Sequence, residues 1–196
     1  MHIPFAKGHL FLTEKVMDRI IEADLFRYGG LKGTKGFIKG WFIPGFRYTF
    51  LLRKIIRHRE YTIKDLLYRI LRRLFAYKEF IISPDAEINE GFYLYHRGTV
   101  YIGPVIIGKN CCVSHNVTIG RAYKNGQIGR PTIGDNVWIG PGAVLVGKIN
   151  IGNNVFIAPN SVVNTDVPDN AMVAGFPARF IVKEDPTKDW VNDILD

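Results

Sequence analysis

The stretch that decides the fold runs from Ile133 to Val163 and reads IGDNVW-IGPGAV-LVGKIN-IGNNVF-IAPNSV-V. An aliphatic residue opens every six-residue block, and glycine or alanine follows it in four of the five complete blocks. Neither the 3.6-residue period of a helix nor the two-residue period of a strand gives this spacing. A six-residue period is typical of a parallel β-helix, in which each block is one short strand and a turn and three blocks make one coil.

The same period continues toward the N-terminus and predicts thirteen repeats, a little over four coils. Coils of this kind are stacked at the ordinary distance between strands, about 4.8 Å. A small residue is expected after each inward-facing one, at a corner where a bulky side chain would clash or demand a positive φ. The predicted inward-facing residues are Ile82, Ile88, Leu94, Val100, Ile107, Val113, Ile119, Ile133, Ile139, Leu145, Ile151, Ile157 and Val163.

One edge of the predicted prism carries two histidines. Residues three repeats apart share an edge of the prism. Leu94, Val113, Ile139 and Ile157 are spaced in this way, so the residues two places after each of them form one ladder. That ladder consists of His96, His115, Pro141 and Pro159. Two of the five histidines are therefore expected one coil apart on the same edge.

The segment from Gly120 to Thr132 interrupts the period. It is too polar and too rich in glycine to continue the prism, so we expect an external loop at another corner. Long loops on a rigid scaffold usually serve function.

The basic residues are concentrated before the repeats. Residues 1–80 hold 17 basic and 7 acidic side chains, whereas residues 81–196 hold 9 and 11. We therefore predict three parts: a basic α-helical N-terminal region (1–80), a β-helix domain (81–168) with the external loop 120–132, and a C-terminal extension (169–196). A short helix is expected over Asp189 to Leu195.

Apolar residues at helical spacing predict amphipathic helices near residues 16–25, 48–56 and 63–75, the last capped by Thr62. The aromatic segment from Gly36 to Gly45 is expected to be irregular. Residues 35–73 hold 11 basic and 2 acidic side chains, which leaves two interpretations open. Either the helices pack on the end of the prism with their arginines solvated, or one face makes peripheral contact with the inner face of a membrane. Nucleic-acid binding is not expected, because no recognised motif accompanies the charge.

The remaining signals are negative. Residues 1–15 lack an apolar run of signal-peptide length, and no segment approaches the ~20 apolar residues that span a bilayer. We therefore expect a cytoplasmic protein. Cys111 and Cys112 are adjacent and lack zinc-site spacing, so we expect two small packing residues, no disulfide and no metal.

Five motifs in order resemble those of the hexapeptide-repeat acyltransferases, which are left-handed β-helix enzymes, in their serine acetyltransferase-like branch. The motifs are Leu94-Tyr95-His96, Val117–Gly120, Arg130–Gly134, Ile139–Ala143 and Gly175–Arg179. Two N-terminal motifs, Ala23–Tyr28 and Pro44–Tyr48, resemble the members associated with capsule, O-antigen and exopolysaccharide synthesis. The resemblance implies left-handed coils and a homotrimer, or a dimer of trimers, with active sites between neighbouring prisms.

The resemblance also implies roles for individual residues. His96 aligns with the general base, and a histidine suits the task because its ordinary pKa lies near neutrality. His115 is either a second active-site histidine or a corner residue at a subunit contact. Acetyl-CoA is the expected co-substrate, and the acceptor is expected near Tyr95, Lys124 and Arg130. The residues expected to bind acetyl-CoA are Gly140, Pro141, Ala158 and Pro159, with Arg179 and Lys183 at its phosphates.

The chain departs from the serine enzymes at positions that matter for the acceptor. Those enzymes place aspartates where this chain has Tyr95 and Ile81, and they carry Arg-His-Pro where it has Gly129-Arg130-Pro131. Carboxylates suited to an ammonium group are therefore missing. The sequence favours O-acetylation of a sugar hydroxyl on a bacterial surface polysaccharide or its precursor. A serine O-acetyltransferase and a non-enzymatic β-helix scaffold are the alternatives. A carbonic anhydrase of the same fold would need three histidine ligands, and the repeats supply two.

Overall fold

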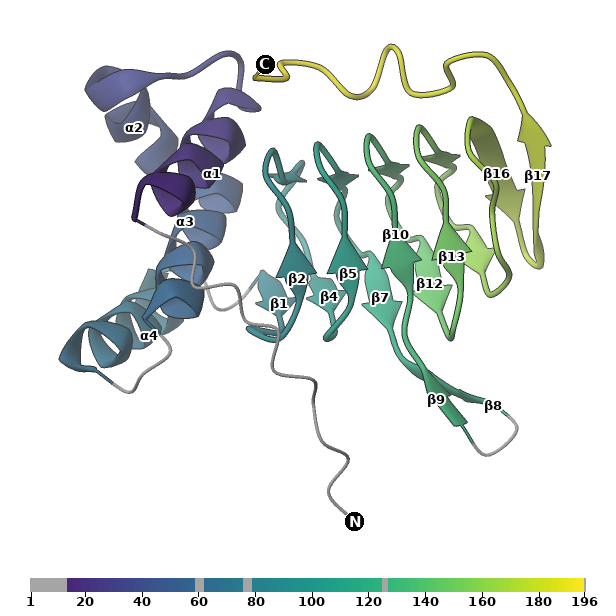
Figure 1. Ribbon diagram of the computed structural model, residues 1–196, viewed down its shortest axis with the longest axis horizontal. Coiled ribbons are helices and arrows are strands. Elements are labelled where there is room, and N and C mark those ends of the chain that lie inside the picture. Colours follow the sequence, from purple (N-terminus) through teal and green to yellow (C-terminus); the bar gives the residue numbers. More distant parts are fainter. Residues whose placement is uncertain (1–13, 59–61, 76–78, 125–126, 196) are drawn as a thin grey trace.

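The computed structural model describes residues 14–58, 62–75, 79–124 and 127–195. The chain forms a parallel β-solenoid with four helices gathered at its N-terminal end (Figure 1). The predicted β-helix is confirmed. None of the helices within the described ranges is long and apolar enough to cross a bilayer.

The helical region contains α1 (Glu14–Phe26), α2 (Gly33–Trp41), α3 (Pro44–Arg57) and α4 (Ile63–Phe75). Thr62 accepts a hydrogen bond from the N–H of Asp65 at 3.3 Å, as its predicted capping role requires. The expectation of an irregular segment from Gly36 to Gly45 is wrong, because α2 covers most of it. Its glycines permit close packing: a Cβ on Gly40 would lie 2.6 Å from the side chain of Leu25.

Three parallel sheets form the faces of the solenoid. Sheet A contains β1 (Phe80–Ile82), β4 (Val100–Ile102), β7 (Thr118–Gly120), β12 (Val144–Val146) and β15 (Val162–Val163). Sheet B contains β2 (Glu87–Ile88), β5 (Ile106–Ile107), β10 (Thr132–Ile133) and β13 (Asn150–Ile151). Sheet C contains β3 (Tyr93–Leu94), β6 (Cys112–Val113), β11 (Trp138–Ile139), β14 (Phe156–Ile157), β16 (Ala171–Gly175) and the antiparallel β17 (Ala178–Val182).

The interruption of the repeat forms a β-hairpin, β8 (Ala122–Lys124) and β9 (Gln127–Gly129), that projects from the solenoid (Figure 1). It leaves the corner between sheets A and B. The segment for which an external loop was expected contains this hairpin.

The register of the first coil differs from the prediction at one strand. Ile102, rather than Val100, pairs with Ile82 and Ile119, whereas Val100 pairs with Phe80 and is also buried inside the prism. The corner after β3 therefore holds two residues more than a six-residue repeat allows, and the next segment is correspondingly shorter. Past Val163 the solenoid continues, because Val167 bridges to Ile151 and Val173 pairs with Ile157.

Glycine and asparagine have different structural roles at the corners of the solenoid. A Cβ on Gly134 would lie 2.7 Å from the carbonyl oxygen of Gly152, so glycine is needed there for the close approach of stacked coils. The positive φ angles expected at the small residues occur instead at asparagines. These are Asn110, Asn116, Asn136, Asn154, Asn160 and Asn170, with φ between 54° and 57°.

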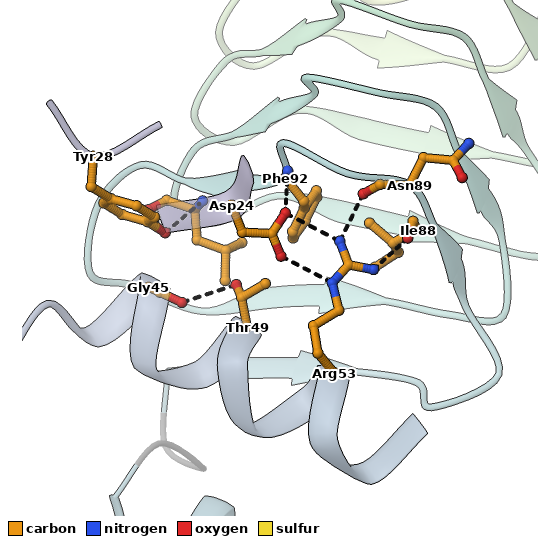
Figure 2. A network of polar contacts seen from close by, with 9 residues as sticks. Asp24, Tyr28, Gly45, Thr49, Arg53, Ile88, Asn89 and Phe92 are labelled. Carbon is orange, nitrogen blue, oxygen red and sulfur yellow. Dashed lines mark hydrogen bonds and ion pairs between the residues drawn. The ribbon is translucent and has the colours of Figure 1, made fainter. Parts of the chain in front are cut away.

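The first coil presents strand edges that no further coil covers, and the helical region satisfies them with side chains. On β1, the hydroxyl of Tyr48 accepts the N–H of Ile82 at 2.9 Å. After β2, the guanidinium of Arg53 donates to the carbonyls of Ile88 and, at 2.7 Å, Asn89. Figure 2 shows this guanidinium paired with the carboxylate of Asp24 at 2.9 Å, both side chains being buried.

The C-terminal segment returns along the solenoid from β17 to the helical region (Figure 1). The ring of Trp190 lies 4.6 Å from that of Trp138 and 5.2 Å from that of Phe156. Arg27, directly after α1, donates to the carbonyl of Asn192. The predicted helix from Asp189 to Leu195 is wrong: the segment forms turns. Its aromatic side chain packs on sheet C instead.

Candidate functional site

The register of sheet C brings the predicted ladder onto one corner. Leu94 pairs with Val113, and the equivalent residues of β11 and β14 continue the stack. The residues two places further on therefore lie at the corner between sheets C and A: His96, His115, Pro141 and Pro159. Backbone hydrogen bonds join this corner, because Gly142 donates to His115 at 3.1 Å and Asn160 to Pro141 at 2.9 Å.

The two histidines are neighbours. Their ring centroids are 5.7 Å apart with the planes inclined at 68°. His96 is exposed and His115 is half-buried. A Cβ on Gly98 would lie 2.7 Å from that of His115, so only glycine lets the longer corner after β3 fold down onto the second histidine.

The surroundings of the two rings are mostly aromatic. The Tyr95 ring contacts His96 edge-on, with centroids 4.4 Å apart. Nδ1 of His115 is buried and has no hydrogen-bond partner within the described ranges. The contacts of His96 there are with the rings of Tyr95 and His115, and no carboxylate is bonded to it.

This arrangement can handle a proton. An exposed imidazole with a second imidazole behind it can accept a proton from a hydroxyl held at the corner. A metal site is not formed, since the described residues contain no group of three histidine, cysteine or acidic side chains placed to hold an ion.

The predicted acetyl-CoA residues continue along this corner for the most part. A Cβ on Gly140 would lie 2.7 Å from the nitrogen of Pro159, which explains glycine at this position. Pro141 and Ala158 are half-buried and Pro159 is exposed.

The two predicted phosphate-binding residues are separated. Arg179 pairs with Ala174 near the end of β16 that adjoins the histidine corner. The N–H of Lys183 donates to Asn170, before β16 begins, so Lys183 lies at the opposite end of that strand.

The predicted acceptor residues do not converge within one protomer. Tyr95 lies beside His96. Arg130 precedes β10 at another corner, where it pairs with Glu87 of sheet B at 3.5 Å. Lys124 belongs to β8, and its side chain lies outside the part of the chain that the structure describes.

The outer surface of sheet A begins at the histidine corner and is apolar. Ile81 and Tyr101 are each 46% exposed there, and Val144 and Val162 are half-buried. Sheet B differs, because exposed Glu87 and Asn150 lie on its outer surface.

Sequence reasoning missed the polar side chains that reach sheet C from the helical region. Asp24 and Tyr28 both bond to the backbone of the segment leading to His96 (Figure 2). The available signal was their place in the motif Ala23–Tyr28, where the aspartate lies in the last turn of α1 and the tyrosine lies just after it.

Comparisons with known proteins agree with this geometry. The family model described as bacterial transferase hexapeptide (six repeats) matches residues 130–165. Serine acetyltransferase 1, chloroplastic, of Arabidopsis thaliana is 45% identical over 109 residues, which are 55% of this chain and 35% of that protein. The serine acetyltransferase of Synechococcus elongatus is 39% identical over 103 residues, 52% of this chain and 42% of that protein. The chain thus spans less than half the length of these curated relatives.

Solved structures cover more of the chain. The serine acetyltransferase of Brucella abortus superposes with a TM-score of 0.70 at 28% identity, covering 87% of this chain and 70% of that one. The serine acetyltransferase of Neisseria gonorrhoeae, in complex with serine, superposes with a TM-score of 0.69 at 30% identity, covering 88% of this chain and 72% of that one. On this similarity and on its repeats, the chain belongs to the hexapeptide-repeat family of bacterial transferases.

Proposed function

We propose that the protein is an O-acetyltransferase that moves an acetyl group from acetyl-CoA to an alcohol hydroxyl, with His96 as the general base. The observation that carries the proposal is the exposed His96 ring, which lies edge-on to that of half-buried His115 with the ring centroids 5.7 Å apart. The membership of a transferase family and the serine acetyltransferase names of its relatives support the reaction class.

The chemistry follows from the two imidazoles. His96 takes the proton of the acceptor hydroxyl while its oxygen attacks the thioester carbon. As the carbon–sulfur bond breaks, the proton passes from His96 to the departing thiolate, and CoA and the acetyl ester are released. His115, through its unpartnered Nδ1, is suited to bind the acceptor or to orient His96. A backbone N–H at this corner would stabilise the developing oxyanion.

Acetyl-CoA would lie along the ladder past Gly140, Pro141, Ala158 and Pro159. Arg179 is the better placed of the two candidate phosphate ligands, because it lies at the end of sheet C that adjoins the ladder. Lys183 would reach the phosphates only from the far end of β16.

Two acceptors, L-serine and a sugar hydroxyl, remain as proposals, and different observations favour each of them. The names of the relatives favour the alternative acceptor, L-serine, over the sugar. A neutral sugar hydroxyl is favoured by Tyr95 and Ile81, which stand where the serine enzymes carry aspartates. The aromatic rather than acidic surroundings of His96 support the second choice.

A homotrimer would complete the site. The exposed apolar residues of sheet A lie directly beside the histidine corner and suit burial against a second prism. Arg130 and Lys124 lie at another corner of the same protomer, so a neighbouring subunit would have to bring them to the histidines.

We further propose that α4 contacts an anionic membrane surface. Its polar side faces α3, where the guanidinium of Arg72 lies 5.7 Å from the ring centre of Tyr48, and its apolar stripe faces outward. Basic residues surround the stripe, as a surface that binds anionic lipid requires. The stripe consists of Ile63, Leu66, Leu67, Ile70 and Leu74, each between 46% and 88% exposed.

The activity is tested by following thiol release from acetyl-CoA with L-serine and with a panel of glycans. The His96→Ala variant should lose a factor of about 10² or more in kcat. The matched control is His58→Ala, because His58 stacks on Tyr68 in the helical region and lies away from the site. Near-normal turnover by His96→Ala overturns the site, and efficient turnover of serine removes the sugar acceptor. Failure to bind acetyl-CoA in calorimetry favours the non-enzymatic scaffold.

The membrane contact is tested by sedimentation with phosphatidylglycerol-containing vesicles at low and high salt. Ile70→Glu should abolish binding, whereas Ile128→Glu, at a more exposed position in β9, should not. No binding of the unchanged protein at low salt rejects the membrane contact. Dissociation of an oligomer by Ile70→Glu, seen by light scattering, would instead assign the stripe to subunit contact.

A further inference from the structure

The strand that leads into His96 has one edge free of any other strand. β3 is the terminal parallel strand of sheet C, and its N–H groups at Tyr93 and Tyr95 donate to β6 at 2.9 Å each. In such a strand the intervening N–H groups, at Phe92 and Leu94, point the other way. Left unpaired, they would each carry a desolvation penalty.

Both groups are satisfied by side chains of α1 and of the turn that follows it. The carboxylate of Asp24 accepts the N–H of Phe92 at 2.8 Å (Figure 2). The hydroxyl of Tyr28 accepts the N–H of Leu94 at 3.3 Å and faces the carbonyl of the same residue at 3.5 Å. A Cβ on Gly45 would lie 2.6 Å from that carbonyl, so the start of α3 also packs directly on Leu94.

A second connection runs through aromatic rings. The Tyr28 ring contacts that of Tyr93 at 4.5 Å, Tyr93 contacts Tyr95 at 5.4 Å, and Tyr95 contacts His96 at 4.4 Å. All three contacts are edge-to-face, the geometry that aromatic quadrupoles favour. The backbone bond and the ring series therefore start from one residue, Tyr28; the bond ends at Leu94, two residues before His96, and the ring series ends at His96 itself.

We propose that Tyr28, supported by Asp24, is the positioning residue for His96, a role that rests on the proposed function. The two side chains fix the backbone of β3 and the ring of Tyr95, and thereby hold the imidazole without a carboxylate beside it. The N-terminal motifs Ala23–Tyr28 and Pro44–Tyr48 then have a common purpose, because Asp24, Tyr28 and Gly45 all converge on Phe92 and Leu94.

The test is Tyr28→Phe, which keeps the ring and removes the hydroxyl. Its matched control is Tyr48→Phe, which removes an equally buried hydroxyl that accepts the Ile82 N–H on β1, a strand that does not lead to His96. Both variants lose one bond to the first coil, so a merely structural role would affect them alike.

We expect Tyr28→Phe to lower kcat by about tenfold or more with the KM for acetyl-CoA unchanged, because small misplacements of a catalytic group are costly. Tyr48→Phe should stay within about twofold of the unchanged protein. Equal kcat losses in the two variants would overturn the positioning role.

A second readout does not depend on the reaction. The Cε1–H resonance of His96, assigned by its loss in His96→Ala, should shift in Tyr28→Phe and stay in place in Tyr48→Phe. An unmoved resonance overturns the proposal even if no acceptor is ever turned over, which separates its failure from that of the proposed function. If Tyr28→Phe does not fold, Tyr93→Leu interrupts the ring series and is judged by the same two readouts.

Discussion

The two ends of the solenoid are closed in different ways. At the far end, β17 pairs antiparallel with β16 through five register pairs, so backbone groups close the edge of sheet C. At the N-terminal end, buried side chains of α1, of the turn after it and of α3 bond to strand edges: Asp24, Tyr28, Tyr48 and Arg53. Backbone pairing accepts many side chains, whereas the N-terminal closure depends on four particular ones. The candidate histidine lies at the end that depends on them.

The largest expected effect is at Arg53. Arg53→Met leaves the buried carboxylate of Asp24 without its counter-charge, which costs about 3–5 kcal/mol of unfolding free energy. The comparison at the far end is Arg179→Met on exposed β17, expected within about 0.5 kcal/mol. Urea unfolding measures the loss of unfolding free energy in each variant. Equal losses in the two variants would contradict the proposed difference between the two ends.

The same variant has a pH signature. Burial raises the pKa of Asp24, and Arg53 opposes that rise. Without Arg53 the folded-state pKa lies further above the unfolded value of 3.8, so the folded state holds the proton more tightly. The deficit of Arg53→Met should therefore grow as the pH rises above 3.8 and shrink toward acid. A deficit independent of pH contradicts the assignment.

A smaller effect is expected at Tyr48. Tyr48→Phe leaves the N–H of Ile82 buried and unpaired, at a cost of about 1–3 kcal/mol. Tyr123→Phe, on the exposed hairpin, removes a hydroxyl of the same kind and should cost almost nothing. A thermal melt distinguishes the two, and an unchanged melting temperature in Tyr48→Phe would mean that water replaces this bond.

The returning C-terminal segment should matter less than either closure. Trp190→Ala removes ring contacts with Trp138 and Phe156, worth about 1 kcal/mol. Ile194→Ala, in the same segment, is the control for loss of apolar area. A loss above about 3 kcal/mol for Trp190→Ala would show that this segment is a third closure.

The smallest expected effect concerns the two cysteines, whose thiols should not react in the folded protein. Cys111 and Cys112 lie in the second coil, and burial raises the pKa of both thiols, that of Cys111 to about 12. At pH 8 the thiols are therefore protonated and enclosed, so Ellman's reagent should react only after unfolding. Reaction of Cys112 below the global transition would reveal local opening beside Arg27, which donates to its sulfur at 2.7 Å.

The sequence predicted the stacked parts of the molecule well. The six-residue period placed Leu94, Val113, Ile139 and Ile157 on one edge because in a repeat every position is fixed by its neighbours. The pairing of His96 with His115 followed from that period. The register of Val100 was predicted wrongly because the corner after β3 is longer than the repeat, although Val100 is buried inside the prism as predicted.

The connections between regions could not be predicted. Asp24 bonds to Phe92 across 68 residues, and neither residue carries a local signal for the other. Arg53 was expected to be solvated with the other arginines, yet it is 4% exposed, because its partners come from α1 and from β2. Asp189 to Leu195 had the spacing of a helix, and contact of Trp190 with sheet C decided otherwise.

The lengthened corner at Gly98 has a consequence for where a ligand can bind along the prism. A stack of equivalent coils has near-translational symmetry, so a ligand lying along it would meet the same surface again about 4.8 Å further on. Gly98 breaks that symmetry along the histidine corner, where the longer turn after β3 folds onto His115. The irregular corner therefore marks one level of the prism, and a ligand that binds there has a defined position along the stack.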